Sequence, residues 1–264
     1  MKRVLALALA MVMALSLAAC GGSDQPTAEE DNWTLRQEKA TEADAALPDE
    51  NDTFTTLKTP CGEIQGVQYE GYSLYRGVRY ATADRWEQAQ QVTEWDGVYD
   101  ATAWGDQCPQ HKSYFGVDDS AINEFYTEES LIQFPAGYSE DCLNLNIWVP
   151  DNAKDCPVLF YIHGGSFLTG SNTDPSVDGE AYAHEGIITV SINYRLGPLA
   201  SAFDGENYLG NYSLSDQITA LHWVRDNIKS FGGDPSRITI MGESAGAASV
   251  QDPRWRTMPS AAPS

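Results

Sequence analysis

Short runs of apolar residues in the second half of the chain predict strands that are buried on both faces. Proline or glycine borders these runs, which lie at residues 157–162 and 186–192, and a third, β-branched run at 238–241 predicts a further strand. Continuous apolar segments of this length are typical of strands in a parallel sheet that helices cover on both sides. Polar residues follow the second run, and we expect Asn193 and Arg195 among them to form structural hydrogen bonds.

The pattern elsewhere predicts one long helix and several antiparallel strands. Residues 210–230 carry apolar side chains at helical spacing, and glycine and proline residues follow them. Polar and apolar residues alternate at 55–59 and 62–67, as in short antiparallel strands joined by a turn. Further strands are predicted at 73–81 and 140–150. The chain therefore combines features of an α/β protein with an antiparallel beginning.

Composition places this pattern in a globular, strongly acidic protein. The 264 residues are 42% hydrophobic, which is enough to bury a large core. The 38 acidic and 16 basic residues give a formal net charge of −22. Nucleic acids and anionic lipids both recruit clustered Lys and Arg side chains. The charge therefore argues against nucleic acid as a partner and against electrostatic adhesion to a membrane.

The first 20 residues have the pattern of an export signal. Lys2 and Arg3 precede an apolar run at 4–17 that is too short to span a bilayer well. Residues 17–21 read Leu-Ala-Ala-Cys-Gly and resemble the lipobox of bacterial lipoproteins, which implies that Cys20 is lipidated and anchors the protein to the membrane. The alternative is an ordinary secretory signal. Both interpretations predict an exported protein on the extracytoplasmic face, where disulfides persist.

Residues 21–53 are predicted to form an acidic, flexible tether. They contain many Asp and Glu residues, few apolar residues and no sustained period. Such a segment cannot bury enough apolar surface to offset the entropy lost on ordering.

The sequence Gly-Glu-Ser-Ala-Gly at residues 242–246 follows the last apolar run and precedes small residues that can start a helix. A strand, a sharp turn and a helix would place Ser244 at the apex, with its Oγ clear of the sheet. The glycines avoid the clashes that a tight turn creates. The N–H of Ala245 would then lie at the helix start, where it can donate to a developing oxyanion.

A second glycine motif, His-Gly-Gly-Ser-Phe, follows the first apolar run at residues 163–167. Two glycines after a strand can simply form a turn. Together with the serine motif downstream, however, they favour an oxyanion loop in which Gly165 and Ser166 donate backbone N–H groups.

These motifs resemble those of type-B carboxylesterases, the cholinesterase-like branch of the α/β-hydrolases. The resemblance runs from about residue 54 to 250, with further matches at residues 75–81, 140–150, 186–197 and 231–246. It departs from the family at Arg79, Asn144 and Ser166, where proline, an aromatic residue and glycine are usual. It implies the N-terminal portion of an α/β-hydrolase fold, with a mixed, mostly parallel sheet flanked by helices.

The resemblance also implies a function. The chain would be a carboxylic ester hydrolase that acts on a small-molecule ester through an acyl-enzyme on Ser244, with Gly165, Ser166 and Ala245 as the oxyanion hole. The family pairs the cysteines that correspond to Cys108 and Cys142 in a disulfide. No motif for a metal or an organic cofactor is present, so none is expected.

Two other cysteines, Cys61 and Cys156, have no assigned partner. They could pair with each other or remain buried thiols. An oxidising compartment favours pairing slightly.

The acid and the histidine of the family's triad lie far downstream of the nucleophile. Only 20 residues follow Ser244, and none of them is histidine. Residues 251–264 no longer resemble the family. We therefore expect a chain that is truncated after the nucleophile turn, with impaired activity. The alternative is an inactive remnant or a non-catalytic surface binding module. The aromatic-rich residues 113–138 could line a substrate gorge or belong to the ordinary core.

Overall fold

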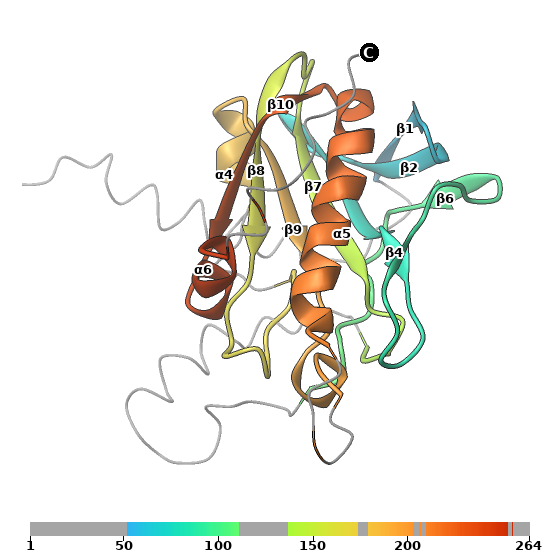
Figure 1. Ribbon diagram of the computed structural model, residues 1–264. Helices are drawn as coiled ribbons and strands as arrows, with labels where there is room; N and C mark the ends of the chain where they lie inside the picture. Colours follow the sequence, from blue (N-terminus) through green and yellow to red (C-terminus); the bar gives the residue numbers. More distant parts are fainter. Residues whose placement is uncertain are drawn as a thin grey trace, which may run out of the picture. The chain divides into compact units, whose positions relative to one another are not determined.

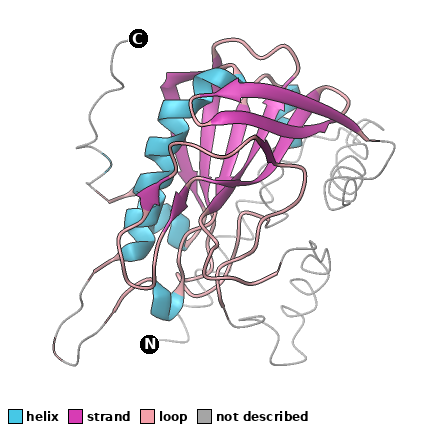
Figure 2. Cartoon of the chain, turned by 90° about the vertical axis from the view of Figure 1, so that its right-hand side faces the viewer, coloured by secondary structure: helices cyan, strands magenta, loops and turns pink. Residues whose placement is uncertain are grey.

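A mixed eight-stranded sheet organises the computed structural model of this protein (Figures 1 and 2). The structure describes residues 52–110, 137–173, 179–202, 206, 210–252 and 255. The predicted signal, Cys20, nearly all of the tether, most of the aromatic segment and most of the C-terminal tail therefore lie outside the described residues. In sheet order, the strands are β1 (Thr53–Thr59), β2 (Gly62–Gln68), β3 (Tyr72–Arg79), β7 (Asn144–Pro150), β9 (Ile188–Ile192), β8 (Cys156–Ile162) and β10 (Gly233–Gly242), with β6 (Val98–Asp100) beside β2.

Helices and short elements complete the fold. Strands β4 (Ala81–Thr82) and β5 (Gln90–Gln91) form a separate antiparallel pair. The α-helices are α4 (Glu180–His184), α5 (Tyr212–Asn227) and α6 (Ala245–Val250), and the 3₁₀ helices are η2 (Gly197–Leu199) and η3 (Ile228–Phe231). Within the described ranges, no helix is both long and apolar enough to cross a membrane.

The sheet is mixed, as expected, but its balance differs from the expectation of mostly parallel pairing. Four of its strand pairs are antiparallel and three are parallel. Strands β1 to β3 follow one another through short turns, which allow only antiparallel pairing. Parallel pairing needs long crossovers, and these occur from β8 to β9 through α4 and from β9 to β10 through α5.

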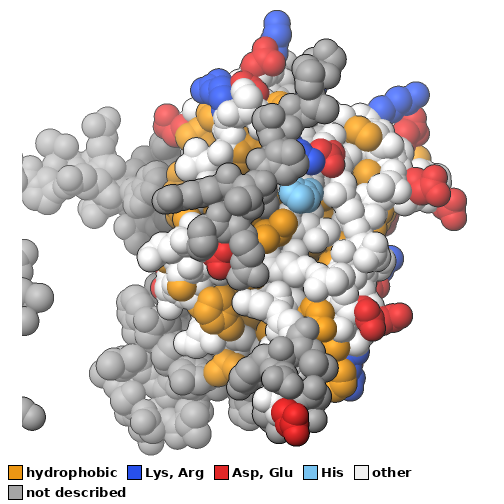
Figure 3. Space-filling model, viewed as in Figure 1, with side chains coloured by type: hydrophobic (Ala, Val, Ile, Leu, Met, Phe, Trp, Pro, Cys, Tyr) orange, Lys and Arg blue, Asp and Glu red, His pale blue; other side chains and the backbone are white. Residues whose placement is uncertain are grey.

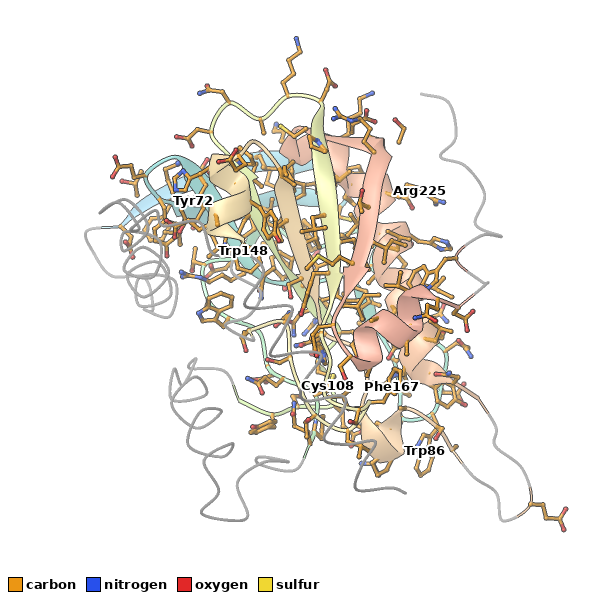
Figure 4. All side chains as sticks on the ribbon, turned by 90° about the vertical axis from the view of Figure 1, so that its left-hand side faces the viewer. Tyr72, Trp86, Cys108, Trp148, Phe167 and Arg225 are labelled. Atoms are coloured by element: carbon orange, nitrogen blue, oxygen red, sulfur yellow. A yellow bond between two sulfur atoms is a disulfide. The ribbon has the colours of Figure 1, made fainter. Side chains whose placement is uncertain are left out.

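Strand β7 shows how helices cover both faces of the sheet. Every residue of β7 is buried. Leu145 and Ile147 pack in one hydrophobic cluster with Trp223 of α5, whereas Trp148 packs in another with Ala183 of α4. Because successive side chains of a strand point to opposite faces, α4 and α5 lie on opposite sides (Figure 4). The predicted helical cover is thereby confirmed.

Strand β10 forms an outer edge of the sheet as far as the structure describes it. It pairs in parallel with β8, and no other described strand pairs with it. The side chain of Met241 is 39% exposed. Figure 3, which has the viewpoint of Figure 1, shows hydrophobic side chains reaching the surface between charged groups. Along residues 238–241 of this edge, half-buried and exposed side chains alternate.

The cysteines follow the expectation in one case and depart from it in the other. Cys108 and Cys142 form a disulfide, which confirms the pairing that the family resemblance implied. Cys61 and Cys156 are free thiols, so the pairing favoured slightly for them is wrong. The Cys61 Sγ donates to Asn227 Oδ1 at 3.4 Å, and burial raises the pKa of this thiol. Cys156 contacts the carbonyl of Lys154 instead.

A buried ion pair joins the end of β9 to α5. The guanidinium of Arg195 donates to both carboxylate oxygens of Asp216, at 2.8 and 2.7 Å, and the backbone N–H of Arg195 donates to the same carboxylate at 3.1 Å. Both side chains are almost completely excluded from solvent. This confirms the structural role expected of Arg195.

Replacing Asp216 by Asn should destabilise the protein strongly, because it leaves the Arg195 charge buried without its counterion. We expect the free energy of unfolding to fall by about 3–5 kcal/mol in urea denaturation. The matched control is Asp226→Asn, which removes the exposed partner of Arg225 and should cost less than about 1 kcal/mol. Equal losses in the two variants would contradict this account.

Candidate active site

The predicted motifs lie together at the carboxyl ends of two adjacent parallel strands, β8 and β10. Ligands of α/β proteins bind outside the carboxyl ends of the strands. His163 follows β8 and Glu243 follows β10, so both predicted motifs lie at this edge of the sheet (Figure 1).

Ser244 occupies a strained turn between β10 and α6. Its backbone has φ 50° and ψ −112°, a region that residues with a side chain rarely adopt. The turn is closed by a hydrogen bond from the N–H of Gly246 to the Glu243 carbonyl at 2.7 Å. The Ser244 side chain is exposed, as predicted for the apex of the turn.

Each glycine of the serine motif is required by a close approach. A Cβ at Gly242 would overlap the Gly246 carbonyl, and a Cβ at Gly246 would overlap the Ile162 carbonyl at the end of β8. A Cβ at Gly164 would overlap the Glu243 side chain and lie 3.1 Å from Ser244 Cβ. The loop after β8 is therefore packed directly against the serine turn.

The loop after β8 forms a left-handed turn. Gly165, Ser166 and Phe167 have φ values of 94°, 56° and 59°. The Gly165 carbonyl accepts hydrogen bonds from the N–H groups of Leu168 and Thr169 at 2.9 and 3.0 Å. Ser166 thus has a backbone conformation that favours glycine. Glycine is the residue usual in the family at this position, so the departure at Ser166 places a side chain on a left-handed backbone.

The N–H groups of Gly165, Ser166 and Ala245 have no acceptor among the described residues. Ser166 is exposed, and Gly165 is half-buried. The structure thus brings the predicted nucleophile and the predicted oxyanion loop together and leaves these donors available. An arrangement of this kind can hold a carbonyl oxygen that gains negative charge.

The disulfide segment supports the far end of this loop. Gln110 lies two residues after Cys108, and its side chain donates to the Gly170 carbonyl and accepts from the Gly170 N–H, both at 2.8 Å. Gly170 has a left-handed φ of 103°. Sequence reasoning missed this contact, and the only signal for it is that Gln110 follows Cys108 and Pro109.

The described histidines serve other contacts. The ring of His163 stacks on Tyr194, His184 pairs with Glu180 at 3.4 Å, and His222 lies on α5, where burial lowers its pKa. Within the ranges that the structure describes, no side chain forms a hydrogen bond with Ser244 Oγ. His111 lies outside those ranges. The described site thus contains no proton acceptor for Ser244.

A groove of about 710 Å³ adjoins the loop and the start of α6. Phe167 and Leu168 line it from the loop, and Ala248 and Ser249 line it from α6. Figure 4 shows Phe167 near the base of the strands. Most of the other lining residues are small or apolar, which suits the apolar part of a small ligand.

Comparisons with known proteins agree with this arrangement. The sequence model of the Carboxylesterase family matches residues 53–252. The chain is 38% identical over 208 residues to para-nitrobenzyl esterase of Bacillus subtilis (strain 168), covering 75% of this chain and 40% of that protein. It is 40% identical over 199 residues to phenmedipham hydrolase of Pseudarthrobacter oxydans, covering 73% of this chain and 38% of the relative.

Solved structures give the same result. A thermophilic PNB esterase matches with a TM-score of 0.64 and 36% identity, covering 75% of this chain and 40% of that structure. The chain therefore spans about 40% of the length of the relatives it matches.

Replacing Gly246 by Ala tests the close approach between the serine turn and β8. Helix propensity alone would stabilise α6 by about 1 kcal/mol, because alanine is the better helix former. The overlap with the Ile162 carbonyl instead predicts a loss of about 1–3 kcal/mol in the free energy of unfolding. Ala248→Gly in the same helix measures the propensity effect by itself. Stabilisation by Gly246→Ala would refute the packing described above.

Proposed function

The chain belongs to the carboxylesterase family, and on that premise we propose that it hydrolyses small carboxylic esters through an acyl-enzyme on Ser244. Ser244 Oγ attacks the ester carbonyl carbon, and the Oγ–carbon bond forms as the hydroxyl proton passes to solvent water, from which the departing alcohol takes its proton. The carbonyl oxygen becomes an oxyanion, and its collapse expels the alcohol. Water then attacks the acyl-enzyme and releases the carboxylic acid.

One observation carries this proposal. The strained turn that exposes Ser244 packs directly against Gly164, so that the nucleophile and the glycine loop lie side by side at the carboxyl ends of β8 and β10. A ligand carbonyl bound at Ser244 therefore meets the backbone of residues 164–166. A serine in an ordinary turn would need neither the strained backbone nor the three close glycine contacts.

We propose that the N–H groups of Gly165, Ser166 and Ala245 stabilise the oxyanion. Support comes from their lack of acceptors among the described residues and from the position of Ala245 directly after Ser244. Backbone donors fixed before the reaction need no reorganisation as charge develops. Removal of a single such donor typically lowers kcat by about 10²–10³-fold.

We further propose that turnover by the described residues alone is slow. None of the described histidines is bonded to Ser244 Oγ, so the step that removes the hydroxyl proton lacks a general base. Serine hydrolases without a working triad still accelerate the reaction about 10³–10⁴-fold over the uncatalysed reaction in water, because the oxyanion hole and substrate binding remain. The same observation favours the second candidate, a non-catalytic module that binds an ester or a similar ligand in the groove beside Phe167.

We propose an extracytoplasmic location with a lipid anchor on Cys20. Support comes from the basic start, the apolar run and the Leu-Ala-Ala-Cys-Gly sequence of the first 21 residues. The Cys108–Cys142 disulfide suits an oxidising compartment.

Purified protein should release p-nitrophenol from p-nitrophenyl acetate in a manner that depends on Ser244. Ser244→Ala should lower the rate on this activated ester, because it removes the nucleophile, and should leave only the residual rate that the oxyanion hole and binding supply. The control is Ser236→Ala, which changes an exposed serine near the other end of β10 and should leave the rate unchanged. Equal rates for wild type and Ser244→Ala would exclude catalysis at this site and favour the binding module.

The lipid anchor is tested by expressing the full sequence in a bacterial host that processes lipoproteins. We expect the mature protein in the membrane fraction, with an N-terminal Cys20 that carries the mass of a diacylglycerol group. Cys20→Ala should move the protein out of that fraction. A mature N-terminus at any other residue would disprove the anchor.

A further inference from the structure

The peptide units that carry the proposed oxyanion donors are held by their carbonyl oxygens. In a planar trans peptide, the orientation of an N–H group follows from that of the preceding carbonyl.

The Ser166 N–H shares its peptide with the Gly165 carbonyl, which accepts hydrogen bonds from the N–H groups of Leu168 and Thr169. The Ala245 N–H shares its peptide with the Ser244 carbonyl, which accepts from the Ala248 N–H at 3.0 Å. Backbone groups therefore fix these two donors.

The third donor depends on a side chain. The Gly165 N–H shares its peptide with the Gly164 carbonyl, and His163 Nδ1 lies 2.8 Å from that oxygen. A carbonyl oxygen only accepts, so Nδ1 must carry the proton in this contact. The geometry thus defines the tautomer of the His163 ring.

The position of the His163 ring is itself tightly defined. The ring is buried and stacks on Tyr194, with the two ring centroids 4.3 Å apart and the ring planes 14° apart. Tyr194 Oη donates to the His163 carbonyl at 2.7 Å. Burial raises the pKa of Tyr194, and Tyr161 and Glu243 raise it further, so its hydroxyl remains a donor. A Cβ at Gly170 would overlap His163 Nδ1, so Gly170 packs closely against the Nδ1 edge of the ring.

The same contacts connect the ring to the serine turn. The His163 carbonyl, which accepts from Tyr194, lies 2.9 Å from the position of a Cβ at Gly246. Movement of the His163 backbone would therefore change the spacing between the glycine loop and the turn that carries Ser244.

We propose that His163 is a positioning residue for ester hydrolysis: its Nδ1–H holds the Gly164–Gly165 peptide so that the Gly165 N–H stays directed at the oxyanion. This inference rests on the proposed esterase function. The hydrogen bond also polarises the peptide, which strengthens the Gly165 N–H as a donor. Without it, a rotation of one peptide unit would turn a carbonyl oxygen toward the developing negative charge.

Two substitutions at His163 separate hydrogen bonding from packing. His163→Phe keeps an aromatic ring against Tyr194 but removes the donor. His163→Asn removes the stacked ring but keeps an N–H donor at the Nδ1 position. If the hydrogen bond positions the peptide, His163→Phe should lower kcat about tenfold to hundredfold with KM changed less than about twofold, and His163→Asn should lose less. His184→Phe, on the exposed side of α4, is the control and should leave kcat unchanged.

A second measurement keeps the inference independent of activity. Long-range ¹H–¹⁵N correlation spectra of the full chain report the tautomer of each of its four histidines, and loss of one signal in His163→Asn assigns the ring. We expect the Nδ1–H tautomer. An Nε2–H tautomer would overturn the inference, as would a loss of kcat in His163→Asn that equals or exceeds the loss in His163→Phe. If wild type shows no Ser244-dependent turnover, the esterase proposal fails, and the tautomer alone decides whether the His163 contact exists as described.

Discussion

The parallel pairing of β10 with β8 is the constraint on which the rest of the site depends. Its register places Gly242 opposite Ile162, so the two strands end level with each other. The serine turn and the glycine loop consequently begin at the same height and must share the space above the sheet edge. Gly246 can approach the Ile162 carbonyl only because it has no side chain. A shift of this register would separate the two motifs even if every residue in them stayed the same.

Behind the loops, buried polar groups keep the strand ends in place. Asn193 at the end of β9 accepts from the Asn172 N–H at 2.7 Å, and Asn172 donates to Asn144 on β7 at 2.9 Å. Asn144 also donates to the Asp106 carbonyl, close to the Cys108–Cys142 disulfide. In a region of low dielectric, these hydrogen-bonded amides favour one arrangement, because an alternative that breaks the bonds leaves further buried polar groups without partners. The residue at 144, where the family usually has an aromatic side chain, is thus part of the scaffold.

The local sequence predicted the elements of the site better than their mutual arrangement. The apolar runs at 157–162, 186–192 and 238–241 correspond to β8, β9 and β10, and the glycine pattern around Ser244 correctly indicated a tight turn. The disulfide was predictable only through the family resemblance. Two features could not be predicted in this way: Cys61 is a free thiol, and His163 stacks on Tyr194. Both depend on which strands become neighbours in the sheet, and the spacing of residues along the sequence does not encode the strand order. The antiparallel β1–β2 turn was predicted, but the antiparallel pairs of β7 with β3 and with β9 join strands far apart in the sequence, which the hydrophobic pattern does not specify.

A site that binds charge through main-chain atoms has a particular evolutionary signature. The N–H groups of Ser166 and Ala245 are present in every residue except proline, so other substitutions at these positions leave the donors in place. Sequence change is instead restricted at Gly164, Gly170 and Gly246, whose missing side chains leave room for neighbouring backbone or rings. Drift at such a site would therefore be recorded in the glycines that make room for their neighbours, and an intact set of these glycines is a more sensitive mark of a preserved site than the donor positions themselves.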